Sequence, residues 1–555
     1  MATSPAIQLG DGPLPEGTIV EKDLMVTMRD GVRIACDVYR PKNPGRYPVL
    51  FASSPYIKDS VDLPSSSMYR YRETGDIGKW VDRAYVYVHA DVRGSGKSEG
   101  TYDVWGPKEQ SDYCELIEWA GTRDWSTGKV GMIGESYYGM NQWQAAQHNP
   151  KHLCCIAPYD AGADIYRHFV YKGGILAIAF LNHWWNNSVR YRHLLDYAER
   201  PQRDDYLAYD FTREIALHPT FDDFWKVRRA NLAAIKVPTF TIGSWEGWGV
   251  HLLGNLQGFM HTSGPKKLMV TTGDAQKLFL EPVVEDALVR WYDHWLKGVD
   301  NGVMKEPPVR MFIRGGQGWR DEQEWPLKRA QTRTLYLAPG KSGAVDSLND
   351  GVLAWEKPSA GQASTSYVSP DPQWTIPGIG TSVMGKMGLP HTTRRIVTFA
   401  SAPLAQDIEV TGPVLFKLWA STTAKDAQFI VKIMDMGPVS PEVATAVKTL
   451  DVAPPARMVT MGWLKASHRA LDAARSTPLA PYHTHENPQP LEPGKVYEFD
   501  IEIWPTCWLF KVGHRIRVDI TSFDLGHHIG HLRGTDTFHH DAGRPSQLLL
   551  PVVPK

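Results

Sequence analysis

Lys129-Val130-Gly131-Met132-Ile133-Gly134-Glu135-Ser136-Tyr137-Tyr138-Gly139 is the stretch from which the fold of this chain can be predicted. The apolar residues before Gly134 form a short run that is typical of a buried strand. Residues 140–146, which follow Gly139, favour a helix. The sequence therefore predicts a strand, a tight turn with Ser136 at its apex, and then a helix.

The glycines on either side of Ser136 suit a serine that is lifted on a sharp turn. A side chain at Gly134 or Gly139 would clash with the neighbouring strand or helix. The backbone N–H of Tyr137, at the start of the helix, would point at an oxyanion. This is the context of a nucleophile elbow and predicts a functional serine rather than an ordinary turn serine. In the best-known form of the elbow the second glycine stands at the place of Tyr138, one residue earlier than here.

Composition and charge narrow the class of protein. With 555 residues the chain is too long for one ordinary core, so roughly two to four structural units are expected. Its 60 Lys and Arg balance 61 Asp and Glu, which gives no reason to expect nucleic acid or an anionic membrane surface as a partner. Five scattered cysteines without a Cys-x-x-Cys pair argue against a disulfide framework and against a zinc finger.

The N-terminal residues and the apolar runs bear on localisation. Residues 1–5 lack a basic region followed by an apolar run, so no signal peptide is predicted. No stretch approaches the ~20 apolar residues that a membrane-spanning helix needs. We therefore expect a soluble, cytoplasmic protein that acts on a small molecule and uses no cofactor. A homo-oligomer is neither favoured nor excluded.

The periodicity divides the chain into four segments. Residues 1–155 contain a hairpin over 24–39, apolar strands at 47–52 and 85–90, and a helix stripe at 113–120, which together predict a mostly parallel sheet. Residues 156–235 have a helix-favouring sequence that is rich in aromatic residues. This is typical of an insertion that forms a lid, or of an ordinary helical subdomain. The pattern of apolar strands and helices that predicts the parallel sheet resumes over residues 236–307. Residues 308–555 alternate with period two, which indicates an all-β sandwich.

Six motifs carry a resemblance to a known family. They are Met28-Arg29-Asp30-Gly31-Val32; Ser54-Pro55-Tyr56; Asp91-Val92-Arg93-Gly94-Ser95-Gly96-Lys97-Ser98-Glu99-Gly100; Gly134-Glu135-Ser136-Tyr137-Tyr138-Gly139; Gly462-Trp463-Leu464-Lys465-Ala466-Ser467-His468-Arg469; and His540-Asp541-Ala542-Gly543-Arg544-Pro545-Ser546. In this order, along nearly the whole chain, they resemble the cocaine-esterase-like CocE/NonD family, related to X-Pro dipeptidyl peptidases and α-amino-acid ester hydrolases. The resemblance implies an α/β-hydrolase core, a helical cap inserted after the elbow, and a C-terminal jelly roll.

The resemblance also implies roles for two residues. The serine of the family's Gly-x-Ser-Tyr-x-Gly motif is the nucleophile, which maps to Ser136. The tyrosine of its Pro-Tyr turn donates to the oxyanion, which maps to Tyr56. The simpler interpretation of Tyr56 is a packed tyrosine whose hydroxyl has a structural partner.

The sequence departs from the family where the rest of a catalytic triad is expected. A serine nucleophile needs a base, and the base needs an orienting carboxylate. The family aspartate falls on Gly247 here, with Glu246 adjacent as a substitute shifted by one residue. The loop over 271–277, where the family histidine stands, contains no histidine, and Asp274 or Ala275 occupies its place. Two of the three triad members are thus lost or relocated, which predicts a degenerate triad.

Other histidines are candidates for the base. His251 lies close to Glu246 in the sequence, and His527, His528 and His531 form a cluster in the C-terminal domain. Such histidines are more often structural than catalytic. The cluster offers three imidazoles to a metal ion, but nearby only Asp524 adds a carboxylate and no cysteine follows, so a metal site is disfavoured.

Three functions remain open from the sequence. The first is hydrolysis of an ester or amide bond in a small, bulky and apolar molecule through a Ser136 acyl-enzyme. The second is a lyase or isomerase on a hydrolase scaffold, with proton transfer handled by Ser136, Tyr56, Glu246 and Asp274. The third is a ligand-binding protein without catalysis. We place hydrolysis first because the nucleophile and the oxyanion donors are present, although a fold does not establish a reaction.

Overall fold

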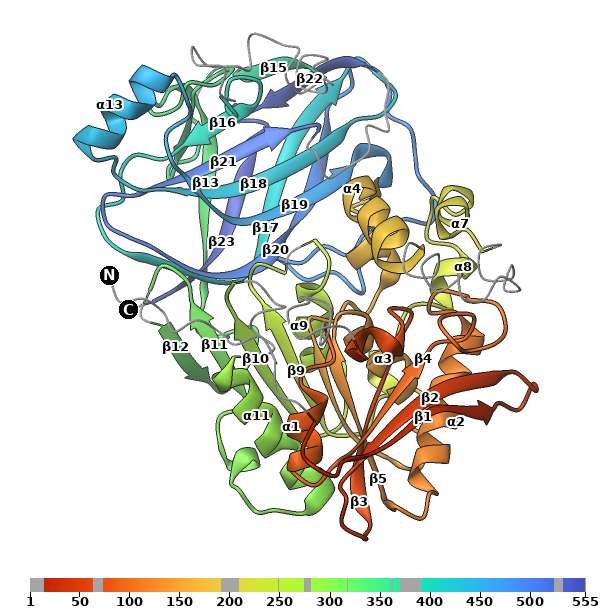
Figure 1. Cartoon of the computed structure of the whole chain (residues 1–555). Helices are drawn as coiled ribbons and strands as arrows, with labels where there is room; N and C mark the ends of the chain where they lie inside the picture. Colours follow the sequence, from red (N-terminus) through yellow and green to blue (C-terminus); the bar gives the residue numbers. More distant parts are fainter. Residues whose placement is uncertain are drawn as a thin grey trace.

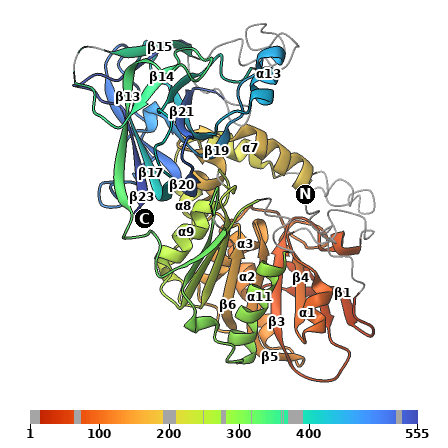
Figure 2. The same cartoon turned by 90° about the vertical axis from the view of Figure 1, so that its left-hand side faces the viewer.

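In a computed structural model of the chain, the described residues are 14–62, 73–190, 209–247, 249–273, 281–316, 318–359, 361, 363–369, 391–523 and 533–554. They form a mixed sheet covered by helices, a closed β domain, and a helical cap between the two (Figures 1 and 2). No helix in these ranges is both long and apolar enough to cross a bilayer.

The first sheet has ten strands in the order β1-β2-β4-β3-β5-β6-β9-β10-β11-β12. Their bounds are β1 (Ile19–Thr27), β2 (Arg33–Arg40), β3 (Tyr47–Ser54), β4 (Val86–Asp91), β5 (Ser126–Glu135), β6 (Leu153–Tyr159), β9 (Thr239–Ser244), β10 (Lys266–Thr271), β11 (Val309–Ile313) and β12 (Gly318–Glu322). From β4 to β11 the neighbours are parallel, so the carboxyl ends of these strands meet at one edge. In an open parallel sheet this edge is where ligands bind.

Helices cover both faces of this sheet, as a buried parallel sheet requires. They are α1 (Ile77–Asp82), α2 (Pro107–Gly121), α3 (Tyr137–Ala146), α9 (Leu252–His261) and α11 (Pro282–Tyr292), followed by the turn η5 (Asp293–Lys297). Trp80 of α1 packs on Tyr292 of α11, with ring centroids 5.4 Å apart. Gly258 of α9 approaches the Trp143 ring of α3 so closely that a Cβ there would lie 2.3 Å from it. These contacts group α1 with α11, and α3 with α9.

The cap follows β6 and lies between the first sheet and the β domain in both views (Figures 1 and 2). It consists of η2 (Ile165–Val170), β7 (Tyr171–Lys172), β8 (Ile175–Leu176), α4 (Ile178–Asn182), η3 (His183–Arg190), α7 (Phe211–Leu217), α8 (Asp223–Lys226) and η4 (Leu232–Ala234). Its large aromatic side chains, among them Trp184, Trp185 and Trp225, are buried in the same apolar core as the sheet. The Arg167 guanidinium also donates to the Thr484 carbonyl, at 2.9 Å, which ties the cap to the β domain.

The C-terminal domain is one sheet that closes on itself. Its strands are β13 (Gln331–Lys341), β14 (Gly351–Ala354), β15 (Ser364–Ser369), β16 (Val397–Ala400), β17 (Ile408–Thr422), β18 (Gln428–Met436), β19 (Arg457–Lys465), β20 (Tyr497–Phe510), β21 (Arg515–Thr521), β22 (Gly534–His539) and β23 (Gln547–Val553). The order is β15-β22-β17-β20-β19-β18-β21-β16-β14-β13-β23, and a further pairing of β23, the last strand in this order, with β17 closes the sheet. The helix α13 (Pro441–Leu450) and the turn η7 (Ala466–His468) complete it.

The predicted fold class is confirmed: an α/β-hydrolase core with an inserted helical cap and a C-terminal all-β domain. One expected boundary moves. Strands β11 and β12, which lie beyond residue 308, pair with β10 and extend the first sheet to Glu322. The reason is visible in the burial pattern of β11, in which Val309, Met311 and Ile313 alternate toward a core. Period two alone does not tell which of two sheets a strand joins.

Candidate active site

Ser136 stands where β5 ends and α3 begins, at the carboxyl edge of the parallel strands. Its backbone has φ 57° and ψ −114°, a conformation that non-glycine residues rarely adopt and that costs about 1–3 kcal/mol. The two flanking glycines permit it. A Cβ on Gly134 would lie 2.3 Å from the Cβ of Tyr138, and one on Gly139 would lie 2.6 Å from the Tyr159 carbonyl oxygen. The predicted strand, turn and helix are confirmed.

His251 is brought to this serine by the helix that follows β9. It is the residue immediately before α9, and its backbone N–H donates to the Gly247 carbonyl at 3.0 Å. Its Nε2 lies 3.1 Å from Ser136 Oγ, within hydrogen-bonding distance. Desolvation lowers the pKa of His251 to about 3, and the nearby Lys172 ammonium contributes in the same direction. The imidazole is therefore neutral at pH 7 and can accept a proton.

Glu246 points away from this pair. Its carboxylate accepts hydrogen bonds from the Thr272 hydroxyl at 2.9 and 3.0 Å and from the Gly273 N–H at 2.8 Å. Arg314 approaches it to 3.4 Å. The one-residue offset from Gly247 thus turns the side chain toward the end of β10. In the part of the chain that the structure describes, no carboxylate lies within ion-pairing distance of the His251 imidazole.

Another carboxylate lies beside Gly247. Asp160 directly follows β6, and its Oδ1 accepts from the Ser244 N–H at 2.8 Å. A Cβ on Gly247 would lie 3.5 and 3.7 Å from the two oxygens of Asp160. Gly247 is the position at which the family resemblance implies an aspartate. It therefore lies next to Asp160, an aspartate that follows a different strand, β6. Sequence reasoning missed Asp160 because only the pairing of β6 with β9 brings it there.

Four predicted residues lie outside the described ranges. Asp274 belongs to 274–280, and His527, His528 and His531 belong to 524–532. Their expected roles stay predictions.

The two predicted oxyanion donors are Tyr137, which follows Ser136 in the chain, and Tyr56, whose ring packs on the ring of Tyr137. Tyr137 is the first residue of α3, so its backbone N–H has no acceptor within the helix. Tyr56 is buried in the turn after β3, and its ring meets the rings of Tyr137 and Tyr138 edge-on, with centroids 5.9 and 6.1 Å apart. The hydroxyl of Tyr56 accepts a hydrogen bond of 2.8 Å from the indole N–H of Trp184 in the cap.

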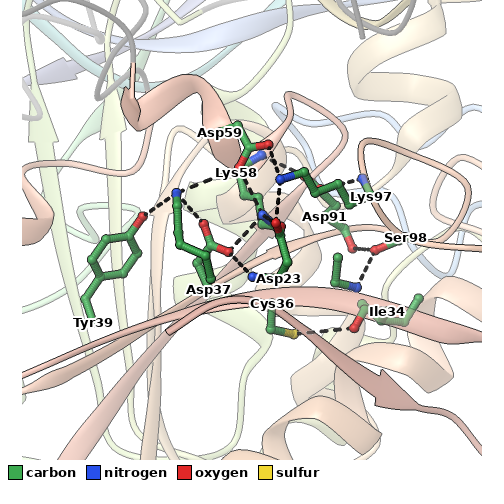
Figure 3. A network of polar contacts seen from close by, with 12 residues as sticks. Asp23, Ile34, Cys36, Asp37, Tyr39, Lys58, Asp59, Asp91, Lys97 and Ser98 are labelled. Atoms are coloured by element: carbon green, nitrogen blue, oxygen red, sulfur yellow. Dashed lines mark hydrogen bonds and ion pairs between the residues drawn. The ribbon is translucent and has the colours of Figure 1, made fainter. Parts of the chain in front are cut away.

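The turn that carries Tyr56 is held by a buried lysine. Lys58 has a fully buried side chain, and its ammonium contacts Asp23 at 2.5 Å, Asp37 at 2.8 Å and Asp59 at 3.0 Å (Figure 3). Its backbone N–H donates to Asp91 at 2.6 Å. Burial alone would lower the pKa of Lys58, but the surrounding carboxylates raise it above its ordinary value. The lysine is therefore a fixed cation.

This network explains both a strained residue and a group of three carboxylates. Ile57, between Tyr56 and Lys58, has φ 67°, which a β-branched residue adopts only when its surroundings impose it. The carboxylates of Asp23, Asp37 and Asp59 are close enough together to hold a metal ion. Because the Lys58 ammonium lies among them, we interpret the group as an ion-pair network rather than a metal site. Sequence reasoning missed Lys58, although it is two residues beyond the Pro-Tyr turn.

A buried carboxyl supports Tyr137 from behind. Glu109 of α2 accepts hydrogen bonds from the hydroxyls of Tyr137, at 2.5 Å, and of Tyr113. Tyr102 in turn donates to the Tyr137 hydroxyl at 3.0 Å, and the Tyr137 ring stacks on Trp105 with centroids 4.4 Å apart. Burial raises the pKa of Glu109 to about 8. A lone glutamate in an amphipathic helix gave no sequence signal for this role.

The fold and this edge of the sheet define a class of protein: a hydrolase-type mixed sheet with a serine elbow, a facing histidine and an added β domain. Comparison with known proteins names the family. The model of the X-Pro dipeptidyl-peptidase (S15 family) matches residues 30–281, and that of the X-Pro dipeptidyl-peptidase C-terminal non-catalytic domain matches residues 301–549. The chain belongs to this group of hydrolases, of the CocE/NonD kind.

Individual relatives cover nearly the whole chain. The cocaine esterase of Rhodococcus sp. is 26% identical, over 96% of this chain and 98% of its own length. A putative serine esterase of Mycobacterium bovis is 27% identical, over 90% of each chain. Among solved structures, a CocE/NonD family hydrolase from Staphylococcus aureus superposes with a TM-score of 0.81 at 27% identity, covering 97% of this chain and 94% of its own. The family resemblance expected from the motifs is confirmed.

The buried Glu109 predicts a pH dependence of stability. In the unfolded chain this carboxyl loses its proton near 4.5, whereas in the folded chain it keeps the proton up to about 8. The folded state therefore binds more protons in this interval, and the free energy of unfolding should fall as pH rises, with a limiting slope of about 1.4 kcal/mol per pH unit. Glu109→Gln should flatten that part of the curve, as measured by urea unfolding between pH 5 and 8. Equal slopes in the two proteins would contradict the assignment.

Proposed function

We propose that the protein hydrolyses an ester or amide bond of a small molecule through an acyl-enzyme on Ser136, with His251 as the base. The distance of 3.1 Å between Ser136 Oγ and His251 Nε2 carries the proposal. It is supported by the strained backbone of Ser136, since such strain persists at functional sites that the surrounding structure over-determines.

The chemistry follows from the positions of four groups. Nε2 of His251 takes the Oγ proton as Oγ attacks the carbonyl carbon. The negative charge that develops on the carbonyl oxygen is stabilised by the backbone N–H of Tyr137 and the hydroxyl of Tyr56. The imidazolium then gives its proton to the leaving oxygen or nitrogen. Water, deprotonated by the same imidazole, cleaves the acyl-enzyme and restores the Ser136 hydroxyl.

The base of this pair has an unusual electrostatic setting. A triad aspartate stabilises the imidazolium that forms when the serine is deprotonated. Among the described residues, no carboxylate contacts His251, and the positive charge of Lys172 lowers its pKa. We therefore describe the site as a Ser–His pair with a degenerate triad. Proton transfer to His251 should be less favourable than in a triad, so the oxyanion donors carry more of the rate enhancement.

The surroundings support an apolar substrate. Trp105 stacks on Tyr137, and Trp184 of the cap lies next to Tyr56. Aromatic rings thus flank both oxyanion donors, as in pockets for apolar groups.

Labelling with a fluorophosphonate probe tests the proposal. Such a probe phosphonylates a serine only if the serine is activated by a base. We expect an intact-mass increase of one adduct per chain, and none in Ser136→Ala. In His251→Gln the labelling rate should fall by about 10²–10⁴-fold, the usual contribution of a general base.

Either of two results would reject the proposal. If the folded wild-type protein forms no adduct, the hydrolase machinery is inactive, and proton-transfer chemistry or ligand binding without turnover becomes the better account. If Ser136→Ala is labelled at the wild-type rate, the nucleophile is elsewhere. Circular dichroism of each variant shows whether a loss of labelling reflects a loss of fold.

The pH profile gives a second test. A histidine with an ordinary pKa of about 6.5 would reduce kcat/KM about 25-fold between pH 7 and pH 5, because only the neutral imidazole accepts the proton. With the pKa of His251 lowered to about 3, kcat/KM should stay nearly constant over this interval. An acidic limb centred near pH 6.5 would show that the imidazole is stabilised as a cation, contrary to this account.

A further inference from the structure

Trp184 of the cap makes a polar contact with the candidate oxyanion site. This residue belongs to η3, far from Tyr56 in sequence, and its indole N–H donates to the Tyr56 hydroxyl at 2.8 Å. An indole N–H is only a donor, whereas a phenol hydroxyl has one donor and two acceptor positions. The contact therefore uses an acceptor position of the Tyr56 oxygen and does not use the hydroxyl proton.

The Trp184 indole is held rigidly, so it can fix the orientation of the Tyr56 hydroxyl. Only 4% of its surface is exposed. It stacks on the Trp105 ring at 5.6 Å with an interplanar angle of 8°, and it meets the Phe169 ring edge-on at 5.2 Å. Trp105 belongs to the core and Phe169 to the cap. The position of the indole thus depends on how the cap is seated on the core.

We propose that Trp184 is a positioning residue of the oxyanion site: its N–H directs the Tyr56 hydroxyl proton toward the oxygen that becomes negative during the attack by Ser136. The inference rests on the proposed function. It adds that the cap takes part in catalysis through one hydrogen bond and not only by covering the site. A donor on the phenol oxygen also polarises the O–H bond and makes it a stronger donor in turn.

The neighbouring tryptophan provides a matched control. Trp185 belongs to the same segment, is 2% exposed, and stacks on the Tyr102 ring at 6.1 Å. Its indole N–H is buried and has no hydrogen-bond partner among the described residues. Phenylalanine at either position keeps an aromatic ring and removes the N–H. The two variants therefore lose similar packing, but only Trp184→Phe loses a hydrogen bond to Tyr56.

The experiment measures the rate of phosphonylation of Ser136 at several concentrations of a fluorophosphonate. The concentration dependence gives the limiting rate constant, kinact, and the half-saturating concentration, KI, separately. We expect Trp184→Phe to lower kinact about 3- to 10-fold, the effect of one neutral hydrogen bond, with KI unchanged within about twofold. Trp185→Phe should leave kinact within about twofold of wild type. Tyr56→Phe should lower kinact by about 10²-fold or more.

A double-mutant cycle distinguishes positioning from packing. In a Tyr56→Phe background, Trp184→Phe should change kinact by less than about twofold, because the hydroxyl it directs is gone. The inference is wrong if Trp184→Phe costs the same factor with and without the hydroxyl, or if both tryptophan variants lower kinact equally. An absence of adduct in the wild-type protein would remove the proposed function and this inference together. A wild-type adduct with a neutral Trp184→Phe would remove the inference alone.

Discussion

The positive φ of Ser136 is the constraint on which the candidate site depends. It lifts the hydroxyl above the carboxyl edge of the parallel strands and sets the first N–H of α3 beside it. Such a turn forms only if the backbone on both sides of Ser136 approaches its neighbours very closely. Gly134 is needed because it lies against Tyr138, and Gly139 is needed because it lies against the Tyr159 carbonyl. Ser136 also donates its own N–H to that carbonyl, at 2.9 Å, and β6 thereby fixes the turn from the side.

Around this turn the two halves of the chemistry are built differently. The oxyanion side is heavily supported: the Lys58 network holds the Tyr56 turn, and Glu109 holds the ring of Tyr137. The proton-accepting side has one neutral histidine with a lowered pKa, next to the positive charge of Lys172. We infer a site that stabilises negative charge on the carbonyl oxygen better than it stabilises positive charge on the base. Such a site should favour substrates with a reactive carbonyl group, because the attack of Ser136 on them needs less help from a base.

The sequence predicted what depends on local patterns. Ser136 was identifiable because strand, glycines and helix are contiguous, and Tyr56 because it lies in a short motif of the family. His251 could be only one of several candidates, since its approach to Ser136 requires β9 and α9 to be placed in space. The role of Glu246 could not be inferred from its place next to the family's aspartate position. An offset of one residue turns its carboxylate toward Thr272 and Gly273. Lys58, Glu109, Asp160 and Trp184 were missed because their roles arise from tertiary contacts between distant segments.

The most direct test of the central claim is a crystal structure of the protein after phosphonylation of Ser136. The tetrahedral adduct stands in for the intermediate, and its free oxygen takes the place of the oxyanion. The account predicts a covalent bond to Ser136 Oγ, with that oxygen about 3 Å from both the Tyr137 N–H and the Tyr56 hydroxyl. An adduct whose oxygen points away from both donors, or a bond to another residue, would contradict it.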